Sequence, residues 1–205
     1  MKKLPTRVLK LGGSLLSLPD IGERTRSWLA SQEPAENRII AGGGDIVEAV
    51  RALAAVHPLP DDYWHWLCID LLQTTFSLAC RLFPDADAVE TTDRFLRLFD
   101  LSREAKPNCA IVNPAAFYTR TNHRSLPLML PESWDTTSDS IAALLARMLD
   151  AEELVLLKSG GPREADYRPT SESSRDPLDP IVDAYFDKAV DSIPRVRLVN
   201  LRAYT

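Results

Sequence analysis

Two lysines stand near the ends of predicted strands and could act together on a phosphate group. Lys10 lies one residue before the end of the apolar segment 7–11, and Lys158 ends the apolar segment 153–158. Asp139 falls in the first turn of a predicted helix, where a carboxylate suits the positive end of the helix dipole. A carboxylate at a helix start and lysines at strand ends bind phosphate or stabilise developing charge.

Two glycine-rich turns follow predicted strands in the first quarter of the chain. Such turns let the backbone approach a ligand closely and point amide hydrogens at it. The first turn fits an exposed tight turn as well as it fits a phosphate site. The second has three glycines where a positive-φ loop needs one, which favours an anion site at the following helix. The two turns comprise Gly12, Gly13 and Ser14, and Gly42, Gly43 and Gly44.

This combination of groups is the one that phosphoryl transfer requires. The transition state spreads negative charge over equatorial oxygens and leaves little covalent chemistry to the protein. Catalysis then consists of placing donor and acceptor in line and neutralising charge with preorganised cations and amides. The sequence contains neither a P-loop motif nor the protein-kinase set of motifs, so the site would belong to another class of phosphate-handling protein.

Strands alternate with helices along the chain, which predicts an α/β fold with an open, mainly parallel sheet. Ligands are expected beyond the carboxyl ends of its strands. The polar, proline-rich segment 159–180 is expected to be a mobile loop or lid within one domain of residues 1–205. Strands are expected near 7–11, 38–41, 86–90, 109–112, 154–157 and 196–200, and helices near 20–31, 46–54, 61–83, 93–99, 141–149 and 179–190.

Bulk properties exclude several classes of protein. The net charge of −5, without a basic run, argues against a nucleic-acid binder. No apolar segment of signal-peptide type follows the first lysines, and charged and polar residues interrupt helix 61–83, so neither secretion nor a membrane span is expected. Three cysteines, an odd number without metal-ligand spacing, suit the reducing cytoplasm.

The predicted helix 61–83 carries a wider apolar surface than one packed face requires. We expect it to cover the sheet on one side and to meet a second copy of the chain in a homodimer on the other. His65 stands early in this helix, beside Trp66. It would either line a substrate pocket or be an ordinary helix histidine with a satisfied hydrogen bond.

The motifs occur in an order that resembles the amino acid kinase superfamily. They are Lys-x-Gly-Gly-Ser at 10–14, Gly-Gly-Gly at 42–44, Thr-Ser-Asp-Ser-Ile-Ala at 137–142 and Leu-Leu-Lys at 156–158. That superfamily includes aspartokinase, acetylglutamate kinase, glutamate 5-kinase, UMP kinase and isopentenyl phosphate kinase. The resemblance covers residues 7–158 and, more loosely, the final helix and strand. It implies a three-layer α/β/α sandwich with a mainly parallel central sheet.

Two further residue pairs, His65-Trp66 and Trp134-Asp135, are similar to a short branch of the superfamily. That branch includes the archaeal-type kinase of methanofuran biosynthesis, which phosphorylates an aminomethylfuran phosphate monoester to a diphosphate. The resemblance implies an ATP-dependent kinase that acts on a small molecule, either a phosphate monoester or a carboxylate.

The resemblance also implies a role for each matching residue. Lys10 and Lys158 would contact the transferring phosphoryl group from two sides, and Asp139 would hold both lysines in place. Mg²⁺ would bridge the ATP phosphates mostly through water, without a protein ligand. The residues expected to bind ATP are Gly12, Gly13, Ser14 and Ser138, and those expected to face the acceptor are Gly42, Gly43, Gly44, His65 and Asp135.

The chain departs from the superfamily after the second lysine. Most members carry an acidic Asp-Val-Asp-Gly-like turn there, whereas Ser159, Gly160 and Gly161 follow Lys158 in this sequence. This departure leaves a second hypothesis open, a non-catalytic ligand-binding or regulatory protein that kept the fold with a reduced nucleotide site. Asp135 also keeps alternatives: it could bind an amine on the substrate, help to order the lysines or cap a turn.

Overall fold

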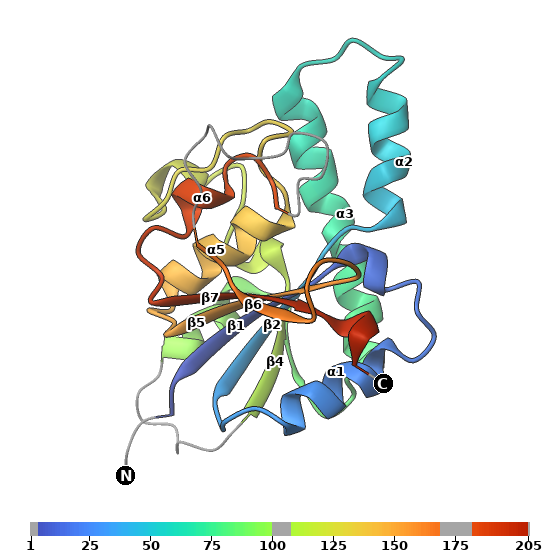
Figure 1. Cartoon of the computed structure of the whole chain (residues 1–205). Helices are drawn as coiled ribbons and strands as arrows, with labels where there is room; N and C mark the ends of the chain where they lie inside the picture. The colour runs from blue at the N-terminus through green and yellow to red at the C-terminus, as the bar shows by residue number, and fades with distance from the viewer. Residues whose placement is uncertain (1–3, 100–107, 169–181, 205) are drawn as a thin grey trace.

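A sheet of seven strands forms the centre of the molecule, which is a computed structural model describing residues 4–99, 108–168 and 182–204 (Figure 1). The strands lie in the order β3-β4-β2-β1-β5-β7-β6. All neighbours pair in parallel except β6 and β7, which are antiparallel. The strands are β1 (Thr6–Leu11), β2 (Glu36–Ala41), β3 (Asp87–Val89), β4 (Asn108–Val112), β5 (Glu153–Lys158), β6 (Glu164–Asp166) and β7 (Arg195–Asn200).

Helices cover both faces of this sheet and complete the expected α/β/α sandwich (Figure 1). Helices α5 and α6 lie on one face and α1 on the other. Helix α3 runs past the sheet, so its first half packs into the core under α5 and its second half into the core beside α1. The helices are α1 (Ile21–Ala30), α2 (Asp45–Ala54), α3 (Asp61–Leu82), α4 (Thr92–Leu96), α5 (Ser138–Met148) and α6 (Phe186–Ala189).

The alternation of side chains along β1 and β5 decides where the two lysines point. Val8 and Lys10 fall on the same face of β1, and Val8 packs into the core under α5. On β5 the same face carries Leu156 and, two residues later, Lys158. Because Lys10 pairs with Leu156 in the register of the parallel strands, the two lysines emerge side by side beneath α5.

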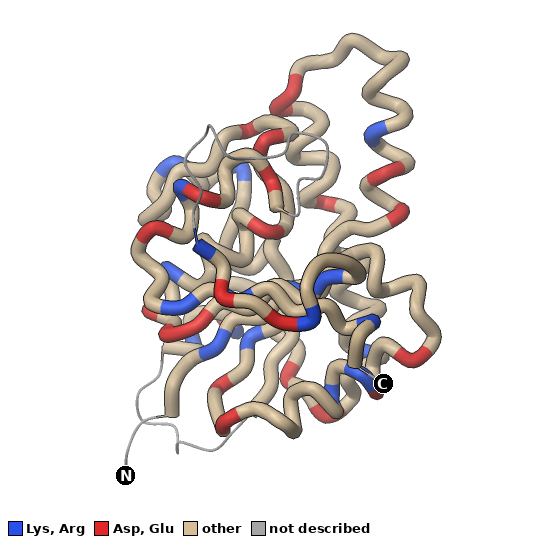
Figure 2. The backbone as a smooth tube through the Cα atoms, in the orientation of Figure 1, with Lys and Arg blue, Asp and Glu red and all other residues tan. Residues whose placement is uncertain are grey.

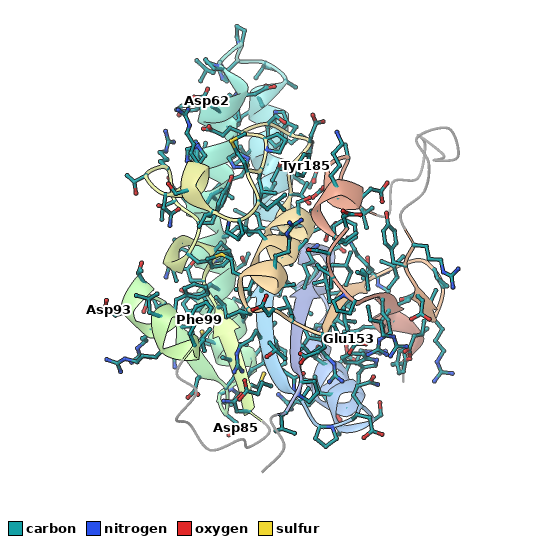
Figure 3. The ribbon with its side chains drawn as sticks, turned by 90° about the vertical axis from the view of Figure 1, so that its left-hand side faces the viewer. Asp62, Asp85, Asp93, Phe99, Glu153 and Tyr185 are labelled. Carbon is teal, nitrogen blue, oxygen red and sulfur yellow. The ribbon has the colours of Figure 1, made fainter. Side chains whose placement is uncertain are left out.

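A cluster of buried charges joins the central strands nearer their amino ends, away from the start of α3 marked by Asp62 (Figure 3). Glu153 on β5 accepts a 2.5 Å hydrogen bond from Arg7 Nε on β1 and forms a 2.7 Å ion pair with Arg197 Nε on β7. Removing one partner from such a group leaves an uncompensated buried charge. The cluster therefore fixes the register of β1, β5 and β7.

Helix α2 projects beside the upper half of α3, with Val50 as its only buried residue and Leu53 51% exposed (Figure 1). Two expectations about other elements need correction. Residues 159–168 include strand β6, which the polar sequence does not indicate. The described part of the predicted helix 179–190 is helical only over α6.

Other expectations lie partly outside the described residues. Segment 169–180 of the expected lid and the start of the last predicted helix fall there. Among the described helices, none combines the length and hydrophobicity needed to cross a membrane. Acidic and basic residues are interspersed along the described backbone (Figure 2).

Candidate active site

A cavity of about 780 Å³ opens beyond the carboxyl ends of β1, β2 and β5. Its walls come from both glycine turns, from α2 and α3, from the start of α5 and from the residues after β5. Open parallel sheets bind their ligands in this position. The cavity therefore lies at the edge of the sheet that the order of strands and turns predicts for a ligand.

Three charged side chains from three elements meet at one wall of this cavity. Lys10 Nζ is 2.9 Å from Asp139 Oδ1, and Lys158 Nζ donates a 2.6 Å hydrogen bond to Asp139 Oδ2. Asp139 and Lys10 are buried, and Lys158 is mostly so. One carboxylate thus holds two ammonium groups, and the trio carries a net positive charge when both lysines are protonated.

Burial and the neighbouring charges act against each other on Asp139. Burial by itself raises the pKa of the Asp139 carboxyl, but Lys10 and Lys158 outweigh it and bring that pKa below its ordinary value. Asp139 is therefore ionised at neutral pH.

For Lys158, burial and the neighbouring like charge outweigh the attraction of the opposite charge. Burial and then the charge of Lys10 lower the pKa of Lys158 to about 8, although Asp139 favours its protonated form. An ammonium with such a pKa carries its charge at neutral pH and loses it under mildly alkaline conditions. A site that neutralises an anion with Lys158 would be sensitive to pH in this range.

The two glycine turns touch each other at the floor of the site. A Cβ added to Gly13 would lie 2.0 Å from the backbone nitrogen of Gly44, which itself has a φ of +56°. No larger residue fits this contact, so the glycines let two backbones approach the same point. Gly13, Gly43 and Gly44 line the cavity.

Gly12 and Gly42 are placed differently from their neighbours. The Gly12 amide donates to Leu157 O at 2.8 Å, so it ties β1 to β5 instead of facing the cavity, although Gly12 is part of the lining. Gly42 is buried behind the lining, where an added Cβ would lie 3.1 Å from Lys10 Cε. Its lack of a side chain makes room for the lysine stem.

Serines join the first turn and the start of α5 to the same cavity. Ser14 Oγ lies 2.8 Å from Ser159 Oγ, which links the first glycine turn to the loop after Lys158. Ser14 and Ser138 both line the cavity. Thr136 Oγ1 is buried in the lining and has no hydrogen-bond partner among the described residues. A buried hydroxyl without a partner suits a group that contacts a bound molecule.

The wall formed by α2 and α3 is mainly apolar, with charged groups at its rim. Arg51 on α2 places its guanidinium carbon 4.6 Å from the ring centre of Trp134, and Glu48 lies 3.4 Å from the Arg51 Nε. Cys68 also faces the cavity, and burial raises its pKa to about 11, so its thiol stays neutral. The apolar lining residues of this wall are Val47, Ile69 and Leu72.

His65 lies at the cavity and also has a hydrogen-bond partner within the protein. It lines the cavity, and its Nε2 lies 2.9 Å from the hydroxyl of Tyr118. Burial lowers the pKa of His65, so the imidazole is neutral at pH 7. Trp66 and Tyr118 pack their rings against it, which holds the imidazole in place.

Asp135 lies outside this arrangement. Its side chain is exposed and does not line the cavity. Its backbone amide donates to Ser133 Oγ, and its carbonyl accepts from the amide of Tyr185. These contacts are those of a turn residue.

Sequence patterns do not single out Asp183, Arg51 or Glu48, which all line the cavity. Asp183 accepts hydrogen bonds from Thr137 and Ser140 at the start of α5. Its position depends on a tertiary contact over more than forty residues, which no local pattern contains. The sequence pattern indicates only that Arg51 and Glu48 are ordinary charges on the outer face of a helix.

The fit to a nucleotide can be judged from the groups present. Two ammonium groups, a partnerless hydroxyl and glycine-lined backbone suit a polyphosphate. Within the described residues, no group of three or more His, Cys, Asp or Glu side chains could hold a metal ion. A divalent cation at this site would thus be bound mainly through phosphate oxygens and water.

Comparisons with known proteins give a curated relative and several solved structures of the same fold. No protein-family model matches the chain. The chain is 25% identical over 150 residues to the [5-(aminomethyl)furan-3-yl]methyl phosphate kinase of Methanocaldococcus jannaschii. The match covers 73% of this chain, which spans 63% of that relative's length.

Solved structures share the fold over nearly the whole chain. The UMP kinase of Bacillus anthracis matches with a TM-score of 0.63 at 12% identity, covering 98% of this chain and 89% of that one. The uridylate kinase of Archaeoglobus fulgidus matches with a TM-score of 0.59 at 16% identity, covering 94% and 89%. The aspartate kinase of Synechocystis matches at 0.51 and 11% identity, covering 94% and 40%. These likenesses show that the chain shares the fold of these kinases.

Proposed function

We propose that this chain, which has the fold of the amino acid kinase superfamily, is an ATP-dependent kinase of a small molecule. The observation that carries the proposal is the meeting of Lys10 and Lys158 on the buried carboxylate of Asp139, at the wall of one cavity. Residues 148 positions apart converge there because β1 and β5 are neighbours in the sheet. A purely structural ion pair does not require a second lysine at a cavity wall.

Each member of the trio would have a separate task in the transfer. Lys10 and Lys158 would neutralise the charge that builds on the equatorial oxygens as an acceptor oxygen bonds to the γ-phosphorus and the bond to the leaving ADP oxygen breaks. Asp139 would hold the two ammonium groups apart at a fixed spacing. Mg²⁺, bound with the nucleotide, would supply further neutralisation of the phosphate charge.

The donor phosphates would lie against the first glycine turn and the start of α5. Gly13, Ser14 and Ser138 line this part of the cavity, and the partnerless hydroxyl of Thr136 is beside them. The Gly12 amide is already bonded to Leu157, so it would not donate to the phosphates. Gly12 would instead allow the backbone to come close to them.

We propose that the acceptor is a phosphate monoester with a small, flat body. The M. jannaschii relative is named for such a substrate, [5-(aminomethyl)furan-3-yl]methyl phosphate. An acceptor phosphate is an anion at neutral pH and needs no general base. The body would rest against the apolar wall of α2 and α3, close to Gly43 and Gly44.

A positively charged group on the acceptor would find its partner at the rim of this wall. Glu48 lines the cavity there, whereas Asp135 is exposed and lies outside the lining. Arg51, whose Nε lies 3.4 Å from Glu48, and Trp134 would cover the same edge of the acceptor. We therefore assign amine recognition to Glu48 in preference to Asp135.

We also propose a homodimer in the cytoplasm. The outer side of α3 carries Leu67, Leu71 and Leu78 at helical spacing, and Leu78 is 43% exposed. The three cysteines are free thiols, as a reducing compartment allows.

An acceptor screen tests the kinase proposal. Release of ADP from Mg²⁺-ATP would be followed with a panel of phosphomonoesters, including aminomethylfuran phosphate, and a panel of amino acids and other carboxylates. Turnover with a phosphomonoester supports the proposed acceptor class, and turnover only with a carboxylate would replace it. Binding of ATP is measured by calorimetry, with and without Mg²⁺. If ATP binds, the result argues against a non-catalytic protein with a reduced nucleotide site. Absence of binding at millimolar ATP would favour that alternative.

A further inference from the structure

The carboxylate of Asp183 sits at the amino end of α5 and is saturated with hydrogen bonds. Its Oδ2 accepts from Thr137 N and Thr137 Oγ1, both at 2.8 Å, and from Ser140 N at 3.1 Å. Its Oδ1 accepts from Ser140 Oγ at 2.6 Å. All four donors lie in the turn that contains Asp139. No other carboxylate in the described part of the chain accepts four hydrogen bonds from one helix start.

This arrangement is stronger than an ordinary helix cap. Thr137 already caps the helix from within, accepting from Asp139 N at 3.3 Å. Asp183 adds a second, ionised acceptor from a segment more than forty residues away. Hydrogen bonds to a charged acceptor are shorter and stronger than neutral ones, and a carboxylate at a helix start is favoured by the helix dipole. The first turn of α5 is therefore held from outside the helix.

We propose that Asp183 is a positioning residue that, by clamping the first turn of α5, fixes the Asp139 carboxylate between Lys10 and Lys158. The inference rests on the proposed kinase function, because it assigns Asp183 a part in the same site. Asp139 is the second residue of that turn, so a shift of the turn moves its carboxylate relative to both lysines. Misplacement of catalytic groups by about 1 Å costs about 100-fold in rate.

The charge of Asp183 also acts on Lys158. The charged groups that face Lys158 are Lys10 from β1, Asp139 from α5 and Asp183. Burial and Lys10 lower the pKa of Lys158, whereas Asp139 and then Asp183 raise it. Loss of the Asp183 charge is therefore expected to move the titration of Lys158 to lower pH. A cap whose charge does not reach Lys158 would leave that titration unchanged.

Two substitutions separate the effect of holding the first turn of α5 in position from the effect of the Asp183 charge. In Asp183→Asn, the amide oxygen still accepts from Thr137 and Ser140 N, and the amide nitrogen can donate to Ser140 Oγ, so the turn is kept and the charge is lost. In Asp183→Ala, the clamp and the charge are both lost. Asp191→Asn is the matched control, because Asp191 is exposed and lies outside the cavity lining.

The first measurement is turnover with ATP and the acceptor, per folded molecule, with folding followed by circular dichroism. We expect kcat to fall by about 100-fold in Asp183→Ala with little change in KM. In Asp183→Asn we expect a smaller loss, with the alkaline limb of the pH profile moved to lower pH. The control should match the unsubstituted protein.

The second measurement does not depend on turnover. The side-chain nitrogen of Lys158 is titrated by NMR in ¹⁵N-lysine-labelled protein, with its resonance assigned by its loss in Lys158→Arg. We expect a lower midpoint in both Asp183 variants than in the control. Midpoints and kcat values equal to those of the control would overturn the proposal. If the unsubstituted protein turns over no acceptor, the proposed function fails, and the titration alone decides the role of Asp183.

Discussion

Lys158 is the side chain whose chemistry is changed most clearly by its surroundings. It is mostly buried, touches the ionised Asp139 and has Lys10 as its neighbour on the same carboxylate. Burial first, and then the charge of Lys10, lower the pKa of Lys158 to about 8. A lysine with this pKa is protonated where a kinase needs a cation and neutral only slightly above that pH.

The pH dependence of kcat/KM follows from this pKa. Lys158 is charged below its pKa and neutral above it, so kcat/KM is expected to be maintained at neutral pH and to fall as the pH rises through about 8. The measurement is a pH profile of kcat/KM for ATP. In Lys158→Arg the alkaline limb should disappear, because a guanidinium stays charged, although the rate will be lower. A profile of the unsubstituted protein that stays level to about pH 10, near the ordinary lysine value, would contradict this role.

Asp139 is expected to matter for both stability and rate. Asp139→Asn leaves two buried ammonium groups without a carboxylate, and breaking a buried pair in this way costs about 3–5 kcal/mol of unfolding free energy. Turnover should also fall, by about 100-fold per folded molecule, because the spacing of the lysines is lost. Urea denaturation and turnover are measured on the same sample. Normal turnover per folded molecule would reduce Asp139 to a structural residue.

At the scale of elements, much of the site could be predicted from local patterns. The apolar segments around Lys10 and Lys158 indicate buried parallel strands, and strands of that kind place their carboxyl ends at one edge. The apolar spacing of α5 likewise indicates which of its faces covers the sheet. The meeting of the two lysines at Asp139 then required only that β1 and β5 be neighbours.

Other parts of the site could not be predicted, because their causes are tertiary. Asp183 binds the start of α5 through a contact between residues more than forty positions apart. The Arg51–Trp134 contact requires α2 and the loop before α5 to face each other across the cavity. The sequence also does not indicate that α2 lies at the margin of the molecule, where Val50 is its only buried residue (Figure 1).

The contact between the two glycine turns gives a prediction at the same scale. Gly13→Ala would place a methyl group 2.0 Å from Gly44 N, so the two turns must separate. We expect the unfolding free energy to fall by about 1–3 kcal/mol, as in overpacked cores, and ATP binding to weaken. Thermal denaturation and calorimetry measure the two effects.

Gly160→Ala is the matched control for this substitution, because an added methyl group there meets nothing within 4 Å. Its thermal stability should equal that of the unsubstituted protein. If Gly13→Ala were equally stable and bound ATP normally, the close approach of the turns would have no part in the site.

At the scale of the whole molecule, α3 links the site to the proposed dimer. Its first half carries His65 and Ile69 on the cavity side, and its outer side carries the exposed Leu78 with the half-buried Leu67 and Leu71. We expect a dimer at micromolar concentration by light scattering after size exclusion. Leu78→Glu should give monomers, because it places a charge on the apolar face. Met129→Glu, at a 63% exposed residue outside α3, serves as the control. A monomeric unsubstituted protein would contradict the dimer.

In the proposed reaction, Lys10 and Lys158 act together on one phosphoryl group. The most direct test is the rate of ADP formation in the presence of the acceptor by Lys10→Ala, Lys158→Ala and the double variant, each per folded molecule. Each single substitution should slow the reaction by about 10²–10³-fold. The double variant should be hardly slower than the slower single one, because groups that act as a unit are not additive. Near-normal rates in either single variant, or losses that multiply in the double variant, would contradict a shared target.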